Sequence, residues 1–324
     1  MTSDIVLPRP GAAPSTAQAS IPGPTEAAFT DVFGKLLPPA DFLETGHGKA
    51  AYYRLTASTA QPSAGRVLFV HGIQTPALGM YPLAAELRKT HPGAELVLVD
   101  LWGHGLSDTP VLPHDPALFH GLIDALLDRL EWPSAHLVGY SMGAALSVGY
   151  TAGNAQRVRS LTLVAPAGMI SSSLLSAEQR AHVSLDCADE PAAERFIVGF
   201  LEGGERVVPA DWKDRVSRGE VVAEAVREWQ ALEHRGHSAS VVAAFRDAGV
   251  MDAHDQFDKA AATGVATLAV LGETDVLSSA RELGEHGLTN VRVIRGADHG
   301  VVRSEVPQVA AHISDFWARY AEEI

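Results

Sequence analysis

Short runs of consecutive apolar residues alternate with longer amphipathic segments along this chain. Near-continuous apolar runs are typical of strands that are covered on both faces of a parallel sheet. Six such runs are present, at residues 66–70, 95–100, 136–141, 161–165, 267–271 and 291–294. Residues 42–57 come before them and predict a hairpin that turns near Gly46–Gly48.

The segments between these runs predict amphipathic helices. The best-defined helix is predicted to begin at Asp115, an N-cap residue, and Pro116, a proline suited to the first helical position. Its apolar residues recur at spacings of three and four as far as Leu130. Further helices are predicted over residues 78–89, 142–153, 278–286 and 306–320. This alternation predicts an α/β fold with a mostly parallel, doubly wound sheet.

One interval breaks the alternation and divides the chain. Residues 169–263 contain charged amphipathic helices and no convincing strand, so they predict a helical cap inserted over the carboxyl edge of the sheet, where open α/β sheets bind ligands. The core is then formed by residues 41–168 and 264–324. Residues 1–40 are rich in proline at their start and predict a flexible or surface-draped arm.

Composition and charge exclude several classes of protein. The 324 residues carry 25 Lys and Arg against 39 Asp and Glu, a net charge of −14, which argues against a nucleic-acid or anionic-membrane partner. The single cysteine, Cys187, excludes an internal disulfide and Cys-based metal sites. No apolar run approaches the roughly 20 residues of a membrane span, and the N-terminal residues do not resemble a signal peptide. We expect a cytoplasmic monomer or homodimer.

The segment Gly139–Gly143 has the form Gly-x-Ser-x-Gly and lies between a predicted strand and a predicted helix. A serine nucleophile needs a sharp turn in this context, and the glycines allow the close backbone contacts that the turn imposes. The alternative is a glycine-rich turn with a capping serine. The position between strand and helix favours Ser141 as a nucleophile.

Two further residues could complete a catalytic triad with Ser141. His299 follows the last predicted strand, and Asp275 follows the strand before it, so both are predicted at the same sheet edge as Ser141. The chain order Ser, Asp, His is the one expected of this arrangement. Glu273 lies on the same loop as Asp275 and is the weaker candidate for the acid. Asp298 is expected to cap or pair locally.

The oxyanion of a tetrahedral intermediate needs two hydrogen-bond donors. We expect one from the backbone N–H of Met142, at the start of a helix whose dipole favours negative charge. The other is expected from the N–H of Ile73, in the loop after the first apolar run. Gly72 would allow the tight bend in that loop, and His71 would support it as a buried hydrogen-bonding side chain.

These motifs together resemble the α/β-hydrolase superfamily, in its branch of capped, single-domain serine hydrolases of the esterase or lactonase type. The resemblance rests on HGI at 71–73, DLWGHGLSD at 100–108, GYSMG at 139–143, and the Asp of GETD and His of GADHG, and it covers residues 41–324. It implies that Ile73 and Met142 donate to the oxyanion. Because Ser141 stands where haloalkane dehalogenases and epoxide hydrolases of this superfamily carry Asp, it argues against their chemistry.

The predicted function is hydrolysis of a small or medium carboxylic ester or lactone through an acyl-enzyme on Ser141. Two alternatives remain open: a carbon–carbon bond hydrolase with the same triad, and a non-catalytic, ligand-binding member of the fold. We expect no cofactor, because the chain has no phosphate loop or dinucleotide motif. We also expect no metal, because His234 and His237 resemble a solvated helix end more than a ligand pair.

The cap is expected to select the substrate. The candidate substrate-binding residues are apolar side chains of the predicted cap and of the loop after residue 100. They are Trp102, Met169, Phe196, Phe200, Trp212 and Trp229. Most aromatic residues on helices pack in a core, so a core position is the alternative for each of these candidates.

Overall fold

The computed structural model describes residues 5–12, 20–57 and 65–320, and within them eight strands form one large sheet. The order across this sheet is β10-β9-β8-β7-β4-β5-β3-β2, and β3 runs against the direction of the other seven strands. The strands are β2 (Asp41–Thr45), β3 (Gly48–Leu55), β4 (Arg66–Val70), β5 (Glu95–Val99), β7 (Ala135–Tyr140), β8 (Val158–Val164), β9 (Thr267–Gly272) and β10 (Val291–Ile294). All six apolar runs form strands, which confirms the predicted mostly parallel α/β sheet.

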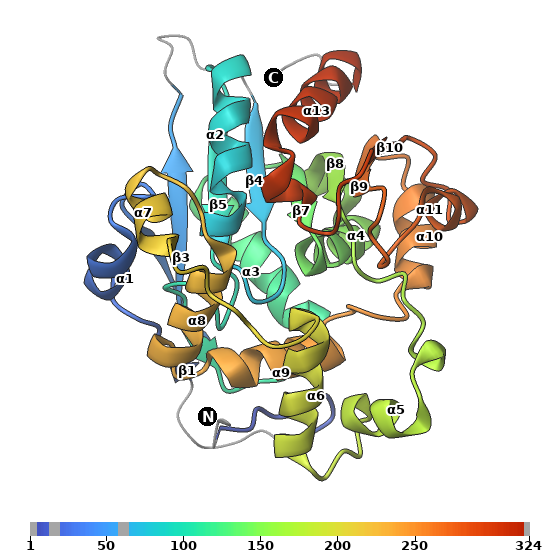
Figure 1. The fold of residues 1–324 in the computed structure, drawn as a ribbon. Helices are drawn as coiled ribbons and strands as arrows, with labels where there is room; N and C mark the ends of the chain where they lie inside the picture. Colours follow the sequence, from blue (N-terminus) through green and yellow to red (C-terminus); the bar gives the residue numbers. More distant parts are fainter. Residues whose placement is uncertain (1–4, 13–19, 58–64, 321–324) are drawn as a thin grey trace.

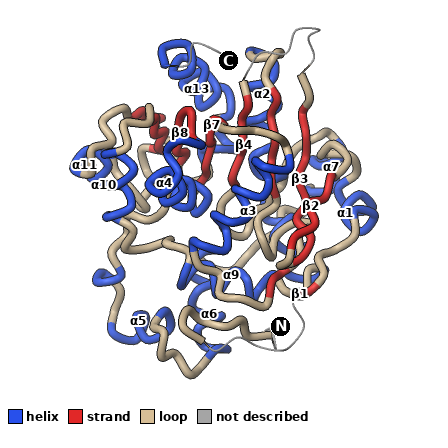
Figure 2. Tube along the Cα trace, turned by 180° about the vertical axis from the view of Figure 1, so that it is seen from behind, coloured by secondary structure: helices blue, strands red, loops and turns tan. Residues whose placement is uncertain are grey.

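Helices cover both faces of the sheet. One face carries η1 (Ala77–Met80), α2 (Tyr81–Thr90), α12 (Val301–Ser304) and α13 (Val306–Tyr320), with α2 and α13 in front in Figure 1. The other face carries α3 (Pro116–Arg129), α4 (Met142–Asn154), η2 (Ala155–Arg157), α10 (His254–Ala262) and α11 (Ala280–Glu285), seen from behind in Figure 2. Helix α3 begins as predicted, since the side chain of Asp115 accepts a hydrogen bond from the N–H of Leu118.

Residues 169–263, all of which the structure describes, contain helices and no strand. The helices are η3 (Ser172–Leu174), α5 (Ala177–Val183), α6 (Glu190–Glu202), α7 (Trp212–Ser217), α8 (Ala223–Glu233), α9 (His237–Asp247) and α10. Helices α5, α6 and α9 lie at one end of the sheet in Figures 1 and 2, with α8 beside them in Figure 1, whereas α10 packs against α4 of the core. We refer to α5–α9 as the cap.

Part of the predicted N-terminal arm is a helix. Helix α1 (Glu26–Phe33) buries Phe29 and Phe33 against the cap, where both rings meet Trp229 edge to face at centroid distances of 5.5 and 5.8 Å. Phe33 also contacts the ring of Trp212 at 6.1 Å. Burying a phenylalanine contributes about 2 kcal/mol, so this contact joins α1 firmly to α7 and α8. Residues Ser20–Ile21 (β1) pair with Thr109–Pro110 (β6) in a second, two-stranded sheet.

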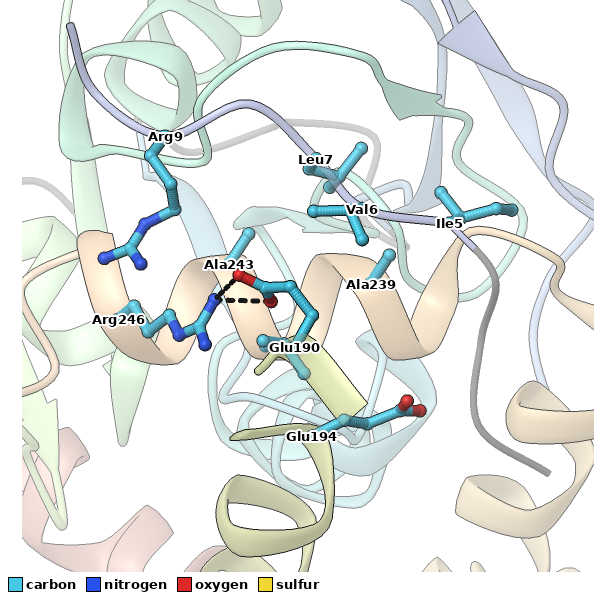
Figure 3. Close-up of a pocket in the computed structure, with 10 residues that line it drawn as sticks. Ile5, Val6, Leu7, Arg9, Glu190, Glu194, Ala239, Ala243 and Arg246 are labelled. Carbon is cyan, nitrogen blue, oxygen red and sulfur yellow. Dashed lines mark hydrogen bonds and ion pairs between the residues drawn. The ribbon is translucent and has the colours of Figure 1, made fainter. Parts of the chain in front are cut away.

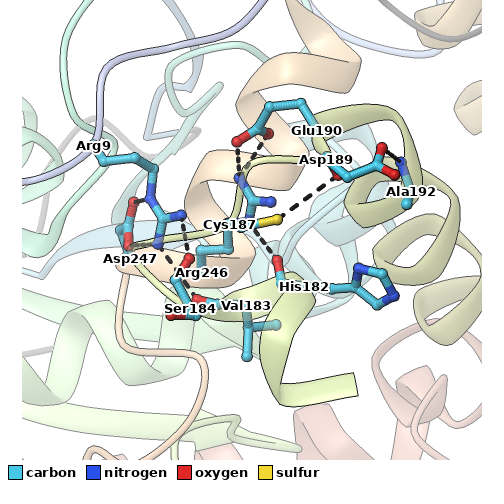
Figure 4. Close-up of polar contacts among 10 residues, drawn as sticks. All are labelled: Arg9, His182, Val183, Ser184, Cys187, Asp189, Glu190, Ala192, Arg246 and Asp247. Atoms are coloured by element: carbon cyan, nitrogen blue, oxygen red, sulfur yellow. Dashed lines mark hydrogen bonds and ion pairs between the residues drawn. The ribbon is translucent and has the colours of Figure 1, made fainter. Parts of the chain in front are cut away.

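Residues 5–12, which we call the N-terminal strap, run across the cap. Leu7 is buried against Ala239 and Ala243 of α9, and Figure 3 shows the strap lying along that helix. Arg9 makes two hydrogen bonds to the carboxylate of Asp247, at 2.8 and 2.9 Å, and donates a third, of 2.9 Å, to the carbonyl oxygen of Ser184 (Figure 4). The strap therefore ties the end of α9 to the chain that follows α5.

His234 and His237 do not form the solvated helix end that the sequence suggests. Both are buried, because the loop between α8 and α9 turns inward against the segment after β5. His237 Nδ1 lies 2.8 Å from the carbonyl oxygen of Gly103, and His234 Nε2 lies 2.8 Å from that of Ser107. Burial lowers the pKa of His237 to about 3, so this imidazole is a neutral hydrogen-bond donor.

No described helix combines the length and the apolar character needed to cross a bilayer. Nor do the described residues include a group of three or more His, Cys, Asp or Glu side chains arranged to hold a metal ion.

Candidate active site

Ser141 occupies a strained turn between β7 and α4. Its φ of 53° and ψ of −118° lie outside the regions that residues with a side chain normally adopt. The flanking glycines are required by close contacts: a Cβ at Gly139 would come within 2.6 Å of Ala144 Cα, and one at Gly143 would collide with the carbonyl oxygen of Val70. The turn lifts the serine side chain out of the sheet at the carboxyl end of β7.

A chain of hydrogen bonds joins the three residues of the predicted triad. His299 Nε2 lies 3.0 Å from Ser141 Oγ, and His299 Nδ1 lies 2.9 Å from Asp275 Oδ2. The Asp275 side chain is fully buried, and its second oxygen accepts a 3.0 Å hydrogen bond from the N–H of Leu277. The buried carboxylate is thus held on both oxygens and orients the imidazole toward the serine.

The two competing carboxylates have other partners. Glu273 accepts a hydrogen bond of 2.8 Å from the N–H of Gly296, and Asp298 accepts one of 2.8 Å from the N–H of Gly300. Asp298 therefore makes the local contact that its position next to His299 suggests. Of these acidic residues near His299, Asp275 is the one whose carboxylate contacts the ring.

The backbone around Ser141 offers two unpaired donors. Gly72 packs so closely on the serine turn that a Cβ there would come within 3.0 Å of Ser141 Cβ. The loop continues into Ile73, and α4 begins at Met142. Among the described residues, neither the N–H of Ile73 nor that of Met142 has a hydrogen-bond partner. These are the two donors that the sequence analysis proposed for the oxyanion.

Two buried side chains support the loop that carries Ile73. His71 Nε2 accepts a hydrogen bond of 2.9 Å from the N–H of Leu101, so its Nδ1 carries the proton and donates to the carbonyl oxygen of Gly72 at 2.6 Å. Burial lowers the pKa of His71 to about 4, which keeps the ring neutral.

The second support, Asp100, was not assigned a role from the sequence. Its carboxylate accepts hydrogen bonds from the N–H groups of Ala77 and Leu106 and from the hydroxyl of Tyr53, at 2.8–3.0 Å. Burial raises the pKa of Asp100 to about 6. The sequence signal was an acidic residue directly after a fully apolar run, where a solvated side chain is not expected.

A cavity of about 660 Å³ opens in front of Ser141 and His299, between the sheet edge and the cap. This volume suits a small-molecule substrate. The apolar part of its lining comes from both core and cap. It comprises Ile73, Ala167, Ile170, Phe200, Leu201, Val221, Ala223, Phe245, Val250, Met251, Val276 and Leu277.

Five of the six predicted substrate-binding residues do not line this cavity. Phe200 does. Trp212 and Trp229 turn away to pack against α1, a partner that the helical pattern of the cap does not reveal. Trp102 and Met169 are buried in the core, and Phe196 stacks on the ring of His182 at 5.3 Å.

The cap is hydrogen-bonded directly to the loop that carries Ile73. Gln230, fully buried on α8, donates from Nε2 to the carbonyl oxygen of Gln74 at 2.7 Å and accepts from the N–H of Gly105 at 2.7 Å. Gln74 has a φ of 64°, and its own side chain donates to Glu202 of α6 at 3.1 Å. This link cannot be predicted from the sequence, because a single glutamine on a helix carries no sequence signal of burial.

The fold and the serine turn define the class of protein. Residues 65–203 match the family model described as the alpha/beta hydrolase fold, and the mostly parallel, eight-stranded sheet with its helices agrees with that fold. The chain therefore has the α/β-hydrolase fold, as the resemblance of its sequence motifs implies.

The individual proteins to which this chain is similar differ in the activities that their names describe. An enol-lactonase from Burkholderia xenovorans LB400 superimposes with a TM-score of 0.63 at 20% identity, covering 86% of this chain and all of that one. A 2-(acetamidomethylene)succinate hydrolase from Mesorhizobium japonicum is 29% identical over 49% of this chain and 55% of its own length. The acetyltransferase component of an acetoin-cleaving system from Pseudomonas putida is 40% identical over 27% of this chain and 22% of its own. These alignments thus span about a fifth to just over half of the curated relatives' lengths.

Proposed function

We propose that this protein is a serine hydrolase that cleaves a small or medium carboxylic ester or lactone through an acyl-enzyme on Ser141. The observation that carries the proposal is the hydrogen-bonded chain from Asp275 through His299 to Ser141 at the mouth of a 660 Å³ cavity. A nucleophile, a base and a group that orients the base, all within hydrogen-bond reach, are the components that acyl transfer requires.

In the proposed mechanism, His299 takes the Ser141 proton through Nε2 as the serine oxygen attacks the substrate carbonyl carbon. The carbonyl oxygen becomes an oxyanion that accepts hydrogen bonds from the N–H groups of Ile73 and Met142. His299 then returns the proton to the leaving alcohol as the carbon–oxygen bond breaks. Water, deprotonated by His299, then attacks the acyl carbon. The bond from that carbon to Ser141 Oγ breaks, His299 returns the proton to Oγ, and the acid is released. Asp275 stays ionised and stabilises the imidazolium.

The relatives support hydrolysis as the reaction class. The similar solved structure is described as an enol-lactonase, and one curated relative as a hydrolase. Ser141 supports an acyl-enzyme rather than the alkyl-enzyme of haloalkane dehalogenases, which use Asp at the elbow. We propose that the cap selects the substrate and that the reaction needs no cofactor or metal, because the triad and two backbone donors account for every proton transfer and charge above.

The test is turnover of 4-nitrophenyl esters from acetate to octanoate, with a fluorophosphonate label in parallel. Ser141→Ala removes the nucleophile, and Ser147→Ala, which changes another buried serine of α4, is the matched control. We expect the wild type and Ser147→Ala to turn over the esters and to be labelled, and Ser141→Ala to do neither. The chain length with the highest kcat/KM would give the size of the acyl pocket.

Two other results would change the proposal. Labelling without ester turnover would keep Ser141 as a nucleophile, contradict a general esterase, and favour a specialised lactone or a carbon–carbon bond substrate. Neither labelling nor turnover in a folded wild-type protein would favour a ligand-binding protein.

The setting of the protein is part of the proposal. We propose a cytoplasmic monomer or homodimer that acts on a free small molecule. Light scattering on the purified chain measures the oligomeric state, and a larger assembly would contradict this part without affecting the chemistry.

A further inference from the structure

The cavity contains an arginine that forms no ion pair with any acidic side chain of the described residues. Arg303 lies on α12, four residues after His299, and lines the same cavity as Ser141. Its guanidinium carbon lies 5.4 Å from the centre of the Tyr140 ring, and Tyr140 directly precedes the nucleophile. The Nη1 atom is buried and has no hydrogen-bond partner among the described residues. Contact with an aromatic face leaves the N–H donors in the guanidinium plane unused.

The other two arginines of the cavity are neutralised by neighbouring carboxylates. Arg215 pairs with Glu220 at 2.9 Å. Arg227 pairs with Glu224 at 3.3 Å and with Glu202 at 3.6 Å. Arg303 differs from both, because no ion pair joins it to a carboxylate of the described residues.

The acidic side chains that line the cavity already have partners. Asp275 is bonded to His299, and Glu202 to Arg206. Asp298 lies across Gly300 from Arg303, but its Oδ1 accepts the hydrogen bond from the Gly300 N–H. Asp298 keeps its own negative charge on the far side of Gly300, but no carboxylate of the described residues lies within ion-pair distance of the Arg303 guanidinium.

An unpaired buried donor costs free energy that a bound acceptor would recover, and the cost is larger for a charged group. The flat guanidinium presents parallel N–H donors, which match the two oxygens of a carboxylate. We infer that the substrate of this enzyme carries a carboxylate in addition to its scissile carbonyl, and that Arg303 binds that carboxylate. This inference rests on the proposed function for the scissile group, and on Arg303 for the charge.

The test compares esters that differ in one charge. The first pair is mono-4-nitrophenyl adipate and its methyl ester, which place the charge on the acyl side. The second pair is 4-acetoxybenzoate and methyl 4-acetoxybenzoate, which place it on the leaving group. We expect a preference of about tenfold or more in kcat/KM for the charged member of at least one pair, and the pair that shows it identifies the side of the carboxylate.

The variants separate Arg303 from a general effect of positive charge. Arg303→Met should abolish the preference, and Arg303→Lys should retain part of it because a point charge remains. Arg215→Met, which removes an arginine that already has a carboxylate partner, should retain the preference. Equal kcat/KM within both pairs in the wild type, or a preference that survives in Arg303→Met, would overturn the inference.

A binding measurement keeps this inference separate from the proposed function. Calorimetry with adipate, against adipamide as the neutral control, needs no turnover. If no ester is hydrolysed and Ser141 is not labelled, the proposed function fails, yet adipate that binds the wild type and not folded Arg303→Met would still support the carboxylate site. Adipate that binds neither protein, or binds both equally, would contradict it.

Discussion

Gln230 of the cap donates a hydrogen bond to the carbonyl oxygen of Gln74, the residue after Ile73. The second contact of its amide, with the N–H of Gly105, ties the same side chain to the segment after β5. One cap side chain thus holds two loops of the core. The position of the Ile73 N–H relative to Ser141 depends on where the cap lies.

Replacing Gln230 by leucine should lower both stability and kcat. The carbonyl of Gln74 and the N–H of Gly105 would stay buried without a partner, at a cost of about 2–4 kcal/mol in the free energy of unfolding. Because Ile73 would lose its support, we expect kcat for a 4-nitrophenyl ester to fall about tenfold, with a smaller change in KM. Gln308→Leu, on the exposed side of α13, is the control and should change neither. An unaltered kcat in a folded Gln230→Leu protein would show that the cap does not position the loop that carries Ile73.

The backbone strain at Ser141 should lower the free energy of unfolding of the protein. At a φ of 53°, glycine is strain-free and any residue with a Cβ is not. We expect Ser141→Gly to raise the free energy of unfolding by about 1 kcal/mol relative to Ser141→Ala, although both variants are inactive. Urea denaturation measures the difference. Equal midpoints for the two variants would show that the turn is relaxed.

Stability should fall as the pH is lowered from about 6.5 to 4. Burial lowers the pKa of His71 and of His114 to about 4, so the unfolded chain takes up protons in this range that the folded chain does not. Asp100 acts in the opposite direction, since its raised pKa favours the folded state below pH 6, but more histidines than carboxylates are shifted. His114→Gln should reduce the loss between pH 7 and pH 4.5 by about 2 kcal/mol.

The exposed His47 provides the control for this pH effect. His47→Gln should leave the loss of stability between pH 7 and pH 4.5 unchanged. Urea midpoints at both pH values give the comparison. A wild-type midpoint that is the same at both would show that these buried histidines do not govern acid stability.

The N-terminal strap should stabilise the cap. Arg9→Met removes two hydrogen bonds to Asp247, whose side chain is 5% exposed, and leaves that carboxylate without its counter-ion. We expect a loss of about 2 kcal/mol in the free energy of unfolding and faster proteolysis near Ser184. Arg54→Met, which breaks a solvent-exposed pair with Glu95, should cost less than about 1 kcal/mol. If both variants lose the same free energy of unfolding, the ion pair of Arg9 stabilises the protein no more than an exposed ion pair does.

The sequence predicted the sheet and the neighbourhood of Ser141 well, for a physical reason. Each buried parallel strand has a local run of apolar residues, and the loop that follows the run lies at the carboxyl edge of the sheet. The sequence therefore predicts that Asp275 and His299 lie near Ser141, although it reveals no long-range contact. The sequence already favours Asp275 over Glu273, and in the structure it is the Asp275 carboxylate that lies within hydrogen-bond distance of the His299 imidazole.

The failures concern residues whose surroundings are formed by distant segments. Trp212 and Trp229 have the pattern of cap residues, but their partner is α1, about 180 residues earlier in the chain. His234 and His237 are polar and close to a helix end, and they are buried because backbone carbonyls after β5 accept their hydrogen bonds. Arg303 belongs to no sequence motif. It became a candidate only because the structure shows no ion pair between its guanidinium and a carboxylate of the described residues.

The strap also has a consequence for the order of folding. Arg9 and Asp247 are separated by 238 positions in sequence, so a growing polypeptide emerges with the strap long before the helix that receives it has been synthesised. Contacts of such long range form late, because the intervening chain must be ordered first. Docking of the strap is thus expected among the last steps of folding, after the cap helices have assembled on the sheet.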